Sequence, residues 1–355
     1  MLSALLYLTG TTPVLANALG KDLKVGERTA MPCLSTAGRA LAASAVALVL
    51  GGAQAGAQTY PASKITVIVA FAPGGVADTL ARLIGQGLSD RLHQSVVVEN
   101  RAGAGGNIAA SFVARAQPDG YTLLATTTAL AINETLFANK DFSTSDLKTV
   151  AIAASSPEAL VTAASNPANN LVEFLNAMNG KTINFAVPGV GTGSDIEAEY
   201  FLKFLAKAPA QMIPFQGGAP AINATIGNQV DLMATTLGGG AAAQIQGGKL
   251  RGLGIAADKR AAVTPNVPTY AEQGFPGFTA ASWVGFFAPA KTDPKIVSAL
   301  NSAINDIVES PDVTKKLTDM GFDPITGAAT EADAMFNAEL DKWGKMVKAL
   351  GLSIK

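Results

Sequence analysis

Two glycine-rich turns are the parts of this sequence best suited to hold a ligand. The first, FAPGGVAD (71–78), follows an apolar run of strand length and leads into a helical pattern, and PGVGTGSD (188–195) repeats the arrangement. A helix that begins at such a turn leaves backbone N–H groups unpaired, and its dipole adds a partial positive charge. The pattern therefore indicates two sites for a carboxylate or phosphate that need no basic side chain.

Both turns also have a structural interpretation. Gly74 and Gly75 suit a tight turn, because glycine adopts backbone angles that other residues avoid. Ser194 and Glu197 have the S-x-x-E spacing of a helix capping box, which is the favoured interpretation of Ser194. Asp78 falls in a first helical turn, where an acidic residue is stabilising in any case. As a ligand contact, Asp78 would suit an amine or hydroxyl and would repel a bare carboxylate.

A third polar group, TTTALAIN (126–133), follows another predicted strand. One of its threonines can cap the next helix, which is the structural interpretation. Alternatively, Thr127, Thr128 or Asn133 can donate hydrogen bonds to a ligand.

Groups able to do covalent chemistry are few. His93 is the only histidine and follows a predicted helix, where it is interpreted as a surface residue. The sequence contains neither a G-x-S-x-G nor an H-E-x-x-H motif. Trp283 and Trp343 are expected in the core, with a place in the ligand cleft as the alternative for Trp283. We therefore expect no catalytic residues, no metal and no cofactor.

Strand patterns alternate with helical patterns, which indicates an α/β protein with parallel sheets covered by helices. In such sheets ligands bind beyond the carboxyl ends of the strands, where both glycine turns fall. The expected strands are 64–71, 95–100, 121–127, 181–187, 210–215, 230–236 and 250–257.

The arrangement occurs twice, so two similar units are expected. The segments 149–164 and 278–290 are apolar or small and suit a chain that crosses between units. Two amphipathic helices are expected within 293–310 and 329–351. The segment 194–206 is expected to be a helix with one apolar face, formed by Ile196, Tyr200, Phe201, Phe204 and Leu205.

The first 57 residues have the pattern of a secretory leader. Met31 is a candidate start, which would make 1–30 a mis-called extension; Arg39 then precedes a short apolar stretch, and small residues up to Ala57 offer a cleavage site. Cleavage removes Cys33, the only cysteine. It leaves 22 of 26 basic and 25 of 27 acidic residues, a net charge of −3, which does not suit nucleic acid. No later stretch has the ~18 consecutive apolar residues of a membrane span, so the mature chain is expected to be soluble.

Several longer segments resemble the Bug-type receptors, the periplasmic substrate-binding proteins of tripartite tricarboxylate transporters. The resemblance covers nearly all of the mature chain in order. Its most specific block is ENRAGAGG…PDGYTLL (99–124), and it continues in GVGTGS (189–194), IPFQGGAPAINATIGNQVDLM (213–233) and WVGFFAPA (283–290).

The resemblance implies a two-lobed Venus-flytrap receptor without chemistry of its own. It implies a monomer that binds a small carboxylate and delivers it to the membrane subunits of an ion-gradient-driven transporter. Residues 58–158 and 284–355 would form lobe 1, with the C-terminal helices packed on it, and 159–283 lobe 2. The implied site residues are Phe71, Ala72, Pro73, Gly74, Gly75, Asp78, Gly189, Val190, Gly191, Thr192, Gly193, Ser194, Gln216 and Gly217.

The sequence departs from the family pattern where the ligand would be chosen. Asp195 stands where the family often has a histidine, Gln216 where a lysine is common, and Thr235 lies where an acid is common. The neutral Thr235 and Gln216 suit an aromatic or extended dicarboxylate better than an amino acid. The segments GVGTGSDIEAEYF and FQGGAPAINAT are similar to the terephthalate-binding members. The alternatives are a secreted α/β enzyme acting on a small carboxylate or ester, which the missing nucleophile and base disfavour, and a ligand-sensing input protein.

Overall fold

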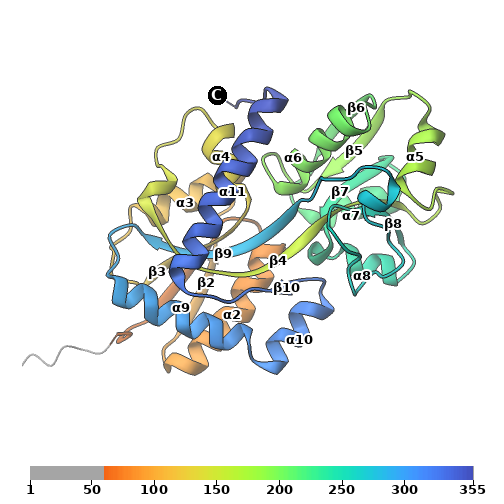
Figure 1. The fold of residues 1–355 in the computed structure, drawn as a ribbon. Coiled ribbons are helices and arrows are strands. Elements are labelled where there is room, and N and C mark those ends of the chain that lie inside the picture. The colour runs from red at the N-terminus through yellow and green to blue at the C-terminus, as the bar shows by residue number, and fades with distance from the viewer. Residues whose placement is uncertain (1–59, 355) are drawn as a thin grey trace, which may run out of the picture. The chain divides into compact units, whose positions relative to one another are not determined.

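The computed structural model describes residues 60–354, so the predicted leader and its cleavage near Ala57 lie outside the described range. No helix within residues 60–354 combines the length and apolar character needed to cross a membrane. The described residues form an α/β fold with two lobes, each a sheet with helices packed against it (Figure 1). Lobe 1 carries the first predicted turn, and lobe 2 carries the second.

The sheet of lobe 1 is parallel at its centre. β1 lies between β2 and β3 and is parallel to both, with Val67 opposite Val98 and Leu123. The sequence of β1, ITVIV, is almost wholly buried, as expected for a strand covered on both faces. The elements of lobe 1 are β1 (Ile65–Val69), α2 (Val76–Leu92), β2 (Val96–Asn100), α3 (Asn107–Ala114), β3 (Thr122–Thr127), α4 (Ala129–Leu136), α9 (Pro294–Val308), α10 (Pro311–Asp319), β10 (Asp323–Pro324) and α11 (Ala329–Leu350).

Lobe 2 repeats the arrangement, as the sequence predicts. β5 lies between β6 and β7 and is parallel to both, with Phe185 opposite Met212 and Leu232. Helix α7 packs against β5 and β7, and α8 packs against β8. The elements of lobe 2 are α5 (Leu171–Met178), β5 (Ile183–Val187), α6 (Gly193–Tyr200), a π-helical turn (Phe201–Leu205), β6 (Ala210–Pro214), α7 (Gly218–Ile226), β7 (Leu232–Thr236), α8 (Ala241–Gln246) and β8 (Leu250–Ile255).

Two long antiparallel strands, β4 (Leu147–Ala163) and β9 (Ala281–Pro289), connect the lobes. β4 pairs with β9 as far as Pro157 and with β7 and β8 from Glu158 and Ala159 onward, while β9 also pairs with β3. This change of partner falls between Pro157 and Glu158, one residue before the predicted boundary between 158 and 159. The lobe limits stay a prediction.

The C-terminal helices lie beside elements from the first part of the chain. α9 contacts α2, and α11 contacts α4 and β4 (Figure 1). α9 begins at Pro294, where the side chain of Asp293 accepts the N–H of Lys295, and α11 ends before Gly351 with a φ of 70°. Both helices fall within the predicted segments, whereas α10 was not predicted.

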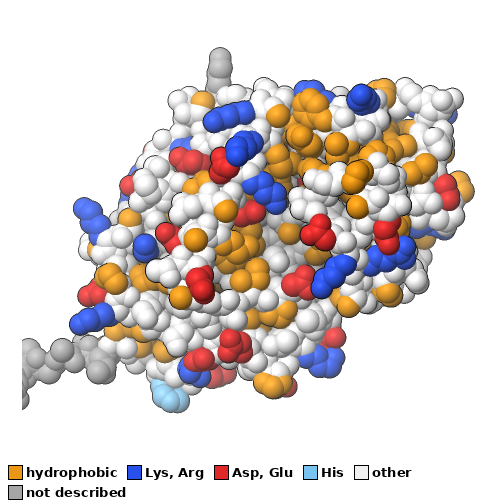
Figure 2. All heavy atoms as spheres, viewed as in Figure 1, with side chains coloured by type: hydrophobic (Ala, Val, Ile, Leu, Met, Phe, Trp, Pro, Cys, Tyr) orange, Lys and Arg blue, Asp and Glu red, His pale blue; other side chains and the backbone are white. Residues whose placement is uncertain are grey.

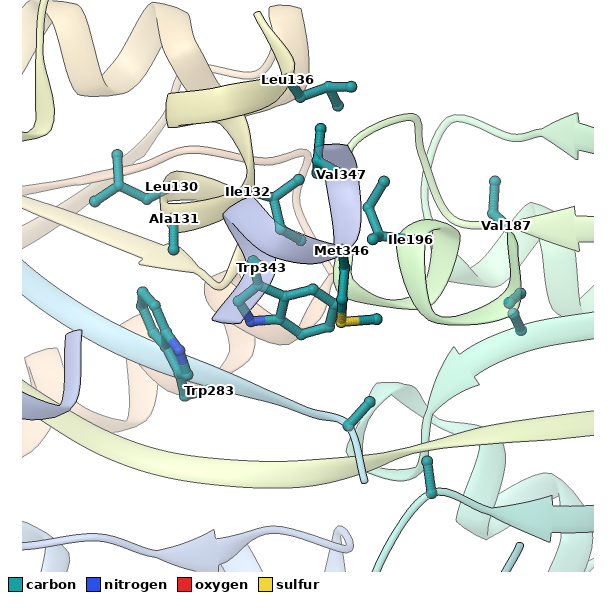
Figure 3. Close-up of a cluster of buried hydrophobic side chains, with 14 of the residues drawn as sticks. Leu130, Ala131, Ile132, Leu136, Val187, Ile196, Trp283, Trp343, Met346 and Val347 are labelled. Atoms are coloured by element: carbon teal, nitrogen blue, oxygen red, sulfur yellow. The ribbon is translucent and has the colours of Figure 1, made fainter. Parts of the chain in front are cut away.

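One cluster of buried apolar side chains extends from lobe 1 into lobe 2. Figure 3 shows Trp283 of β9 and Trp343 of α11 near Ile132 of α4, with Ile196 of α6 beyond them. Trp283 is 1% exposed and Trp343 is fully buried, so both tryptophans belong to the core. The alternative that Trp283 faces a ligand cleft is not supported.

The predicted helix over 194–206 changes character halfway. Its first part is α6, but Phe201–Leu205 is a π-helical turn. A π turn contains an extra residue and therefore rotates the residues that follow it. Ile196 and Phe201 are buried as expected, whereas Phe204 is 38% exposed, so the predicted apolar face does not continue to Phe204.

Candidate functional site

The first predicted turn, Phe71–Gly75, connects β1 to α2. Gly74 has a φ of 80°, a backbone angle that favours glycine. α2 begins after Gly75 with no side-chain cap, so no capping side chain satisfies the N–H groups of its first turn. Ala72, Pro73 and Gly74 are exposed, and Phe71 and Gly75 are partly buried. An anion therefore has access to this helix terminus.

Asp78 holds the first turn in place from within α2. Its Oδ2 accepts the N–H of Gly74 at 2.9 Å, its Oδ1 accepts from Asn100 Nδ2 at 2.8 Å, and Arg82 pairs with both oxygens. Burial alone would raise the pKa of Asp78, but these hydrogen bonds and the Arg82 charge outweigh it and lower the pKa. The geometry gives Asp78 a positioning role, and direct ligand contact stays a prediction.

The second predicted turn, between β5 and α6, has the same local geometry. Gly191 has a φ of 75°, and its N–H donates to Asp195 Oδ2 at 2.8 Å. Here, however, the helix is capped, because Thr192 Oγ1 accepts the N–H of Asp195 and also donates to the carbonyl of Gly189. Val190 is exposed at 38%, whereas Gly191 and Gly193 are buried.

Asp195 differs from Asp78 in its surroundings. It is 3% exposed, its Oδ1 has no hydrogen-bond partner, and no cation pairs with it within the described residues. Burial raises the pKa of Asp195 to about 7; the Gly191 N–H opposes this shift, and the charge of Glu199 adds to it. Asp195 therefore changes its charge near neutral pH.

The predicted capping box of Ser194 and Glu197 is wrong. Thr192 is the N-cap, so Ser194 lies inside the helix, where its hydroxyl donates to Glu158 Oε2 at 2.6 Å. Glu197 is fully buried and accepts from the Tyr270 hydroxyl at 2.6 Å. The S-x-x-E spacing failed because a better-placed threonine precedes it by two residues.

The polar segment 126–133 was given two interpretations, helix capping by a threonine and hydrogen bonds to a ligand. Thr128 is the N-cap of α4 but makes no capping hydrogen bond, and its buried hydroxyl lies 3.0 Å from Ser282 Oγ. Thr127 Oγ1 accepts weakly from the N–H of Ala129 at 3.3 Å. Asn133 is buried and donates to the carbonyl of Gly105, while its Oδ1 has no partner.

Several predicted residues from the two lobes meet. A Cβ built on Gly191 would lie 2.7 Å from Asn133 Oδ1, and one on Gly193 would lie 3.0 Å from Thr128 Oγ1. The lobes approach again where a Cβ on Gly239 would lie 3.4 Å from Val76. The second turn therefore lies against α4, and the start of α2 faces the turn that follows β7.

The remaining predicted residues lie at the ends of β6 and β7. Gln216 is exposed, and Gly217, with a φ of 113°, precedes α7, which has no side-chain cap. Thr235 is 2% exposed and donates to the carbonyl of Thr236 at 3.2 Å. A Cβ on Gly218 would lie 3.6 Å from the Gly239 carbonyl, which places this turn beside the one after β7.

Sequence reasoning missed the buried acid Glu158 and the glycine turn at 238–240. Glu158 is the only acid in the apolar crossing segment 149–164, and LGGG (237–240) repeats the strand–glycine–helix pattern, so both carried a signal. Burial raises the pKa of Glu158 to about 7, opposed by hydrogen bonds from Ser194 and Ser282 and by the Lys342 charge. Burial also raises the pKa of Glu197 to about 8. The hydrogen bond from Tyr270 opposes this shift, and the charge of Glu158 adds to it.

Other surface features lie apart from these turns. Hollows of about 350 and 320 Å³ lie on lobe 2 and share Lys207, Ala208 and Pro209 in their walls. Figure 2 shows apolar side chains gathered over lobe 2 near α6 and β5.

Within residues 60–354 no group of three histidine, cysteine, aspartate or glutamate side chains is placed to hold a metal ion. His93 is exposed at the C-cap of α2, as predicted.

Two lobes that share a pair of crossing strands are the architecture of a two-lobed solute-binding protein, and in this chain α2 and α7 begin without a side-chain cap. The family model described as "Tripartite tricarboxylate transporter family receptor", TctC, matches residues 80–352. The chain belongs to this family of periplasmic solute-binding receptors, as the resemblance implied.

Individual relatives agree with this assignment. Protein BugT of Bordetella pertussis is 35% identical over 318 residues, covering 84% of this chain and 93% of BugT. MatC from Rhodopseudomonas palustris with bound malate is 33% identical, with a TM-score of 0.76 and coverage of 81% and 100%. An R. palustris protein with adipate is 29% identical, with a TM-score of 0.79 and coverage of 83% and 99%.

Proposed function

We propose that this receptor binds a small mono- or dicarboxylate between its lobes and delivers it to the membrane subunits of a tripartite tricarboxylate transporter. The observation that carries the proposal is the pair of helices that begin at the interlobe turns without a side-chain cap, namely α2 and α7. Their first N–H groups and dipoles favour an anion. The similar structures with malate and adipate support a carboxylate.

The predicted site contains no lysine or arginine, so the ligand would be held by backbone N–H groups and neutral side chains. Arg82, in the helix that follows the first turn, is paired with Asp78. Gln216 and Thr235 are uncharged, which suits an extended or aromatic dicarboxylate such as terephthalate. We include terephthalate among the candidate ligands on the basis of these residues and of the sequence similarity.

A binding role is favoured over the alternative of a secreted enzyme. His93 lies at the far end of α2 from the Gly74 turn, and a helix of 17 residues is about 25 Å long. The two serines that contact a buried acid, Ser194 and Ser282, are 3% and 7% exposed, and both donate to Glu158. This pair is buried in the structure that joins the lobes, and we assign it no catalytic role.

The first test is a thermal shift and calorimetry series with malate, adipate and terephthalate, using adipamide as the neutral counterpart of adipate. A ligand at 100 times its Kd stabilises the folded state by about 2.7 kcal/mol. We expect at least one acid to bind unchanged and adipamide not to bind. Conversion of an acid to product would favour the enzyme, and no shift with any of the acids would contradict the carboxylate.

A matched pair of substitutions tests the location of the site. Gln216→Glu places a negative charge at the predicted turn before α7, whereas Gln211→Glu makes the same change at an exposed position of β6. We expect the first to weaken carboxylate binding at least tenfold and the second to leave it unchanged. Equal effects would contradict the proposed site.

Delivery has its own test, because a sensor would bind the same ligand. Uptake of the labelled acid into vesicles that contain the transporter membrane subunits should require this receptor. Light scattering on the purified protein should give the mass of a monomer. Uptake at the same rate without the receptor would favour the sensing alternative.

A further inference from the structure

A continuous chain of hydrogen bonds joins the two lobes through Glu158. Ser194 Oγ donates to Glu158 Oε2 at 2.6 Å, and Ser282 Oγ donates to Glu158 Oε1 at 2.5 Å. Thr128 Oγ1 lies 3.0 Å from Ser282 Oγ. The four side chains are between 0 and 7% exposed, so water does not compete for these bonds. Thr128 is the N-cap of α4 in lobe 1, and Ser194 lies in the first turn of α6 in lobe 2.

Glu158 occupies the point where the lobes are joined. It is the first residue of β4 to pair with β7 after the strand leaves β9. The backbone there is fixed on both sides, because the Glu158 N–H donates to Ala280 and its carbonyl accepts from Ala256. The carboxyl group therefore projects from a rigid support, and movement of one lobe against the other must change its hydrogen bonds.

Gly193 supplies independent evidence for tight packing around this group. A Cβ on Gly193 would lie 2.5 Å from Ser282 Oγ, 2.6 Å from Glu158 Oε1 and 3.0 Å from Thr128 Oγ1. Its φ is not in the left-handed region, so backbone conformation does not require glycine there. Glycine is required because the backbone of α6 lies directly against the hydrogen-bonded chain.

We propose that Glu158 is an interlobe positioning residue, which ties the start of α4 to the start of α6 and thereby sets the spacing of the ligand-binding turns. This link between the lobes, called the tie below, consists of the hydrogen bonds among Thr128, Ser282, Glu158 and Ser194. Its effect on ligand binding rests on the proposed function. It does not require Glu158 to touch the ligand.

The geometry of these hydrogen bonds determines which hydroxyl donates to which oxygen when Glu158 is charged. Each hydroxyl has one proton; Ser282 gives its proton to Glu158, so Thr128 must donate to Ser282. When Glu158 is protonated, its own proton can go to Ser282 or Ser194 and the direction can reverse. Both forms keep the chain continuous, but the charged form carries the cost of burial.

The titratable groups that face Glu158 are few. α6 contributes Glu197, which Tyr270 contacts at 2.6 Å, and α11 contributes Lys342. β9, α4 and β7 contribute only hydroxyls, those of Ser282, Thr128 and the register partner Thr236. Burial raises the pKa of Glu158 to about 7 with the lobes together, and exposure of the carboxyl would return it toward its ordinary value. Protonation therefore favours the arrangement in which Glu158 is buried, and this advantage is lost as pH rises through 7.

Amide hydrogen exchange of the ligand-free protein tests the tie directly. In Glu158→Ala we expect exchange, corrected for intrinsic rates, to accelerate about tenfold in both α4 and α6, as for loss of hydrogen bonds to a buried acid. Glu197→Ala is the matched control, because it removes a buried acid whose partner, Tyr270, lies in lobe 2; it should accelerate exchange in α6 only. Glu158→Gln keeps an acceptor and a donor and should restore most of the protection.

Ser282→Ala is a milder variant that keeps the test decisive if Glu158→Ala folds poorly. It cuts the branch to Thr128 and leaves the bond between Ser194 and Glu158, so only α4 should exchange faster. No change in α4 with either Glu158→Ala or Ser282→Ala would overturn the proposal. So would equal acceleration in α9, which would show a general loss of stability rather than release of the tie.

Ligand affinity supplies the second measurement. If malate or adipate binds, the affinity of the native protein should fall as pH rises from 6 to 8. Glu158→Gln should reduce that dependence more than Glu197→Gln does and leave the part that is due to Asp195. An unchanged pH dependence in Glu158→Gln would overturn the effect on binding. If neither probe binds, the proposed function is in question, but the exchange experiment still decides whether the tie exists.

Discussion

The turn at Gly74 and the turn at Gly191 share a local geometry and differ in charge. In each, a glycine with φ of 75–80° donates its N–H to the carboxylate of an aspartate four residues later, at 2.8–2.9 Å. Asp78 is paired with Arg82, and its pKa is lowered; Asp195 has no cationic partner, and its pKa is raised to about 7. The same G-x-x-x-D device therefore carries a permanent charge in lobe 1 and a titrating one in lobe 2.

This difference shows that the chemistry of a turn depends on its neighbours as much as on its own sequence. Lobe 1 surrounds the carboxylate with donors and leaves the helix start uncapped. In lobe 2 the carboxylate of Asp195 is buried, and the side chain of Thr192 caps the start of α6. The first turn is therefore the better anion site, and the second is the more sensitive to pH.

The largest effect is expected from the titration of Asp195. Its folded pKa is raised from 3.8 to about 7, so its contribution to stability is present below pH ~4 and is lost as pH rises through 7. Asp195→Asn should remove about 3–4 kcal/mol of the fall in unfolding free energy between pH 4 and 8, measured by urea denaturation. Asp78→Asn should instead change the unfolding free energy at acid pH. The lowered pKa of Asp78 stabilises the folded state above the pKa that this group has in the unfolded chain, and this contribution is lost as pH falls. A native pH profile retained in Asp195→Asn would contradict the assignment.

The next largest difference is expected from alanine substitutions of Gly191 and Gly74, which should destabilise the protein by unequal amounts. Gly191→Ala adds the strain of a positive φ and a clash with Asn133 Oδ1 at 2.7 Å, which together cost about 3 kcal/mol. Gly74→Ala adds the same strain with no atom within 4 Å, at a cost of about 1 kcal/mol. Chemical denaturation of the two variants checks the difference, and equal losses would mean that the lobes do not meet at Gly191.

Asp78→Asn should cost about 1–2 kcal/mol at pH 7. The aspartate is 3% exposed and accepts from Gly74 and Asn100, so these two bonds carry most of the effect. The contribution of Arg82 is small, because its side chain is 52% exposed. Arg82→Gln is the control and should cost less than half as much; a larger loss than that of Asp78→Asn would reverse the assigned roles.

The smallest effects concern the two helix caps. Thr192→Ala removes the cap of α6 and should cost about 1 kcal/mol. Gly75→Ser gives α2 a side-chain cap and should leave stability equal or slightly higher. The same substitution should weaken carboxylate binding, because the new hydroxyl occupies N–H groups that the ligand would use. Tighter binding by Gly75→Ser would contradict the anion site at α2.

Local sequence patterns were sufficient to predict β1, β2, β3, β5, β6, β7 and β8, the two glycine turns and the crossing segments, which the structure shows to be β4 and β9. β1 and β5 fall within the predicted runs because both are apolar and of strand length, and β5 is followed directly by Pro188. The family followed from longer motifs, such as the block at 99–124. These features depend on residues that are close together in sequence.

The hydrogen-bonded chain at Glu158 could not be predicted in this way. Ser282 is 124 positions from Glu158, and Ser194 is 36 positions away, so only the folded topology brings them together. The capping box of Ser194 was wrong because Thr192 caps α6, and the partner that the Ser194 hydroxyl has instead, Glu158, is brought to it only by the folded topology. The charge difference between Asp78 and Asp195 likewise depends on burial and on distant partners.

The apolar core that joins the lobes limits how such receptors can be recombined. Each lobe has an apolar cluster of its own, but side chains of α4, α11 and β9 pack in a further cluster with Ile196 of α6, so part of the interior is shared between the lobes. We expect residues 60–354 to unfold in one step, and a lobe grafted from a relative to fold only if α4, α6 and α11 come from the same parent. New ligand preferences in this architecture would then arise by point substitution in the turns, because exchange of whole lobes breaks the interior on which both depend.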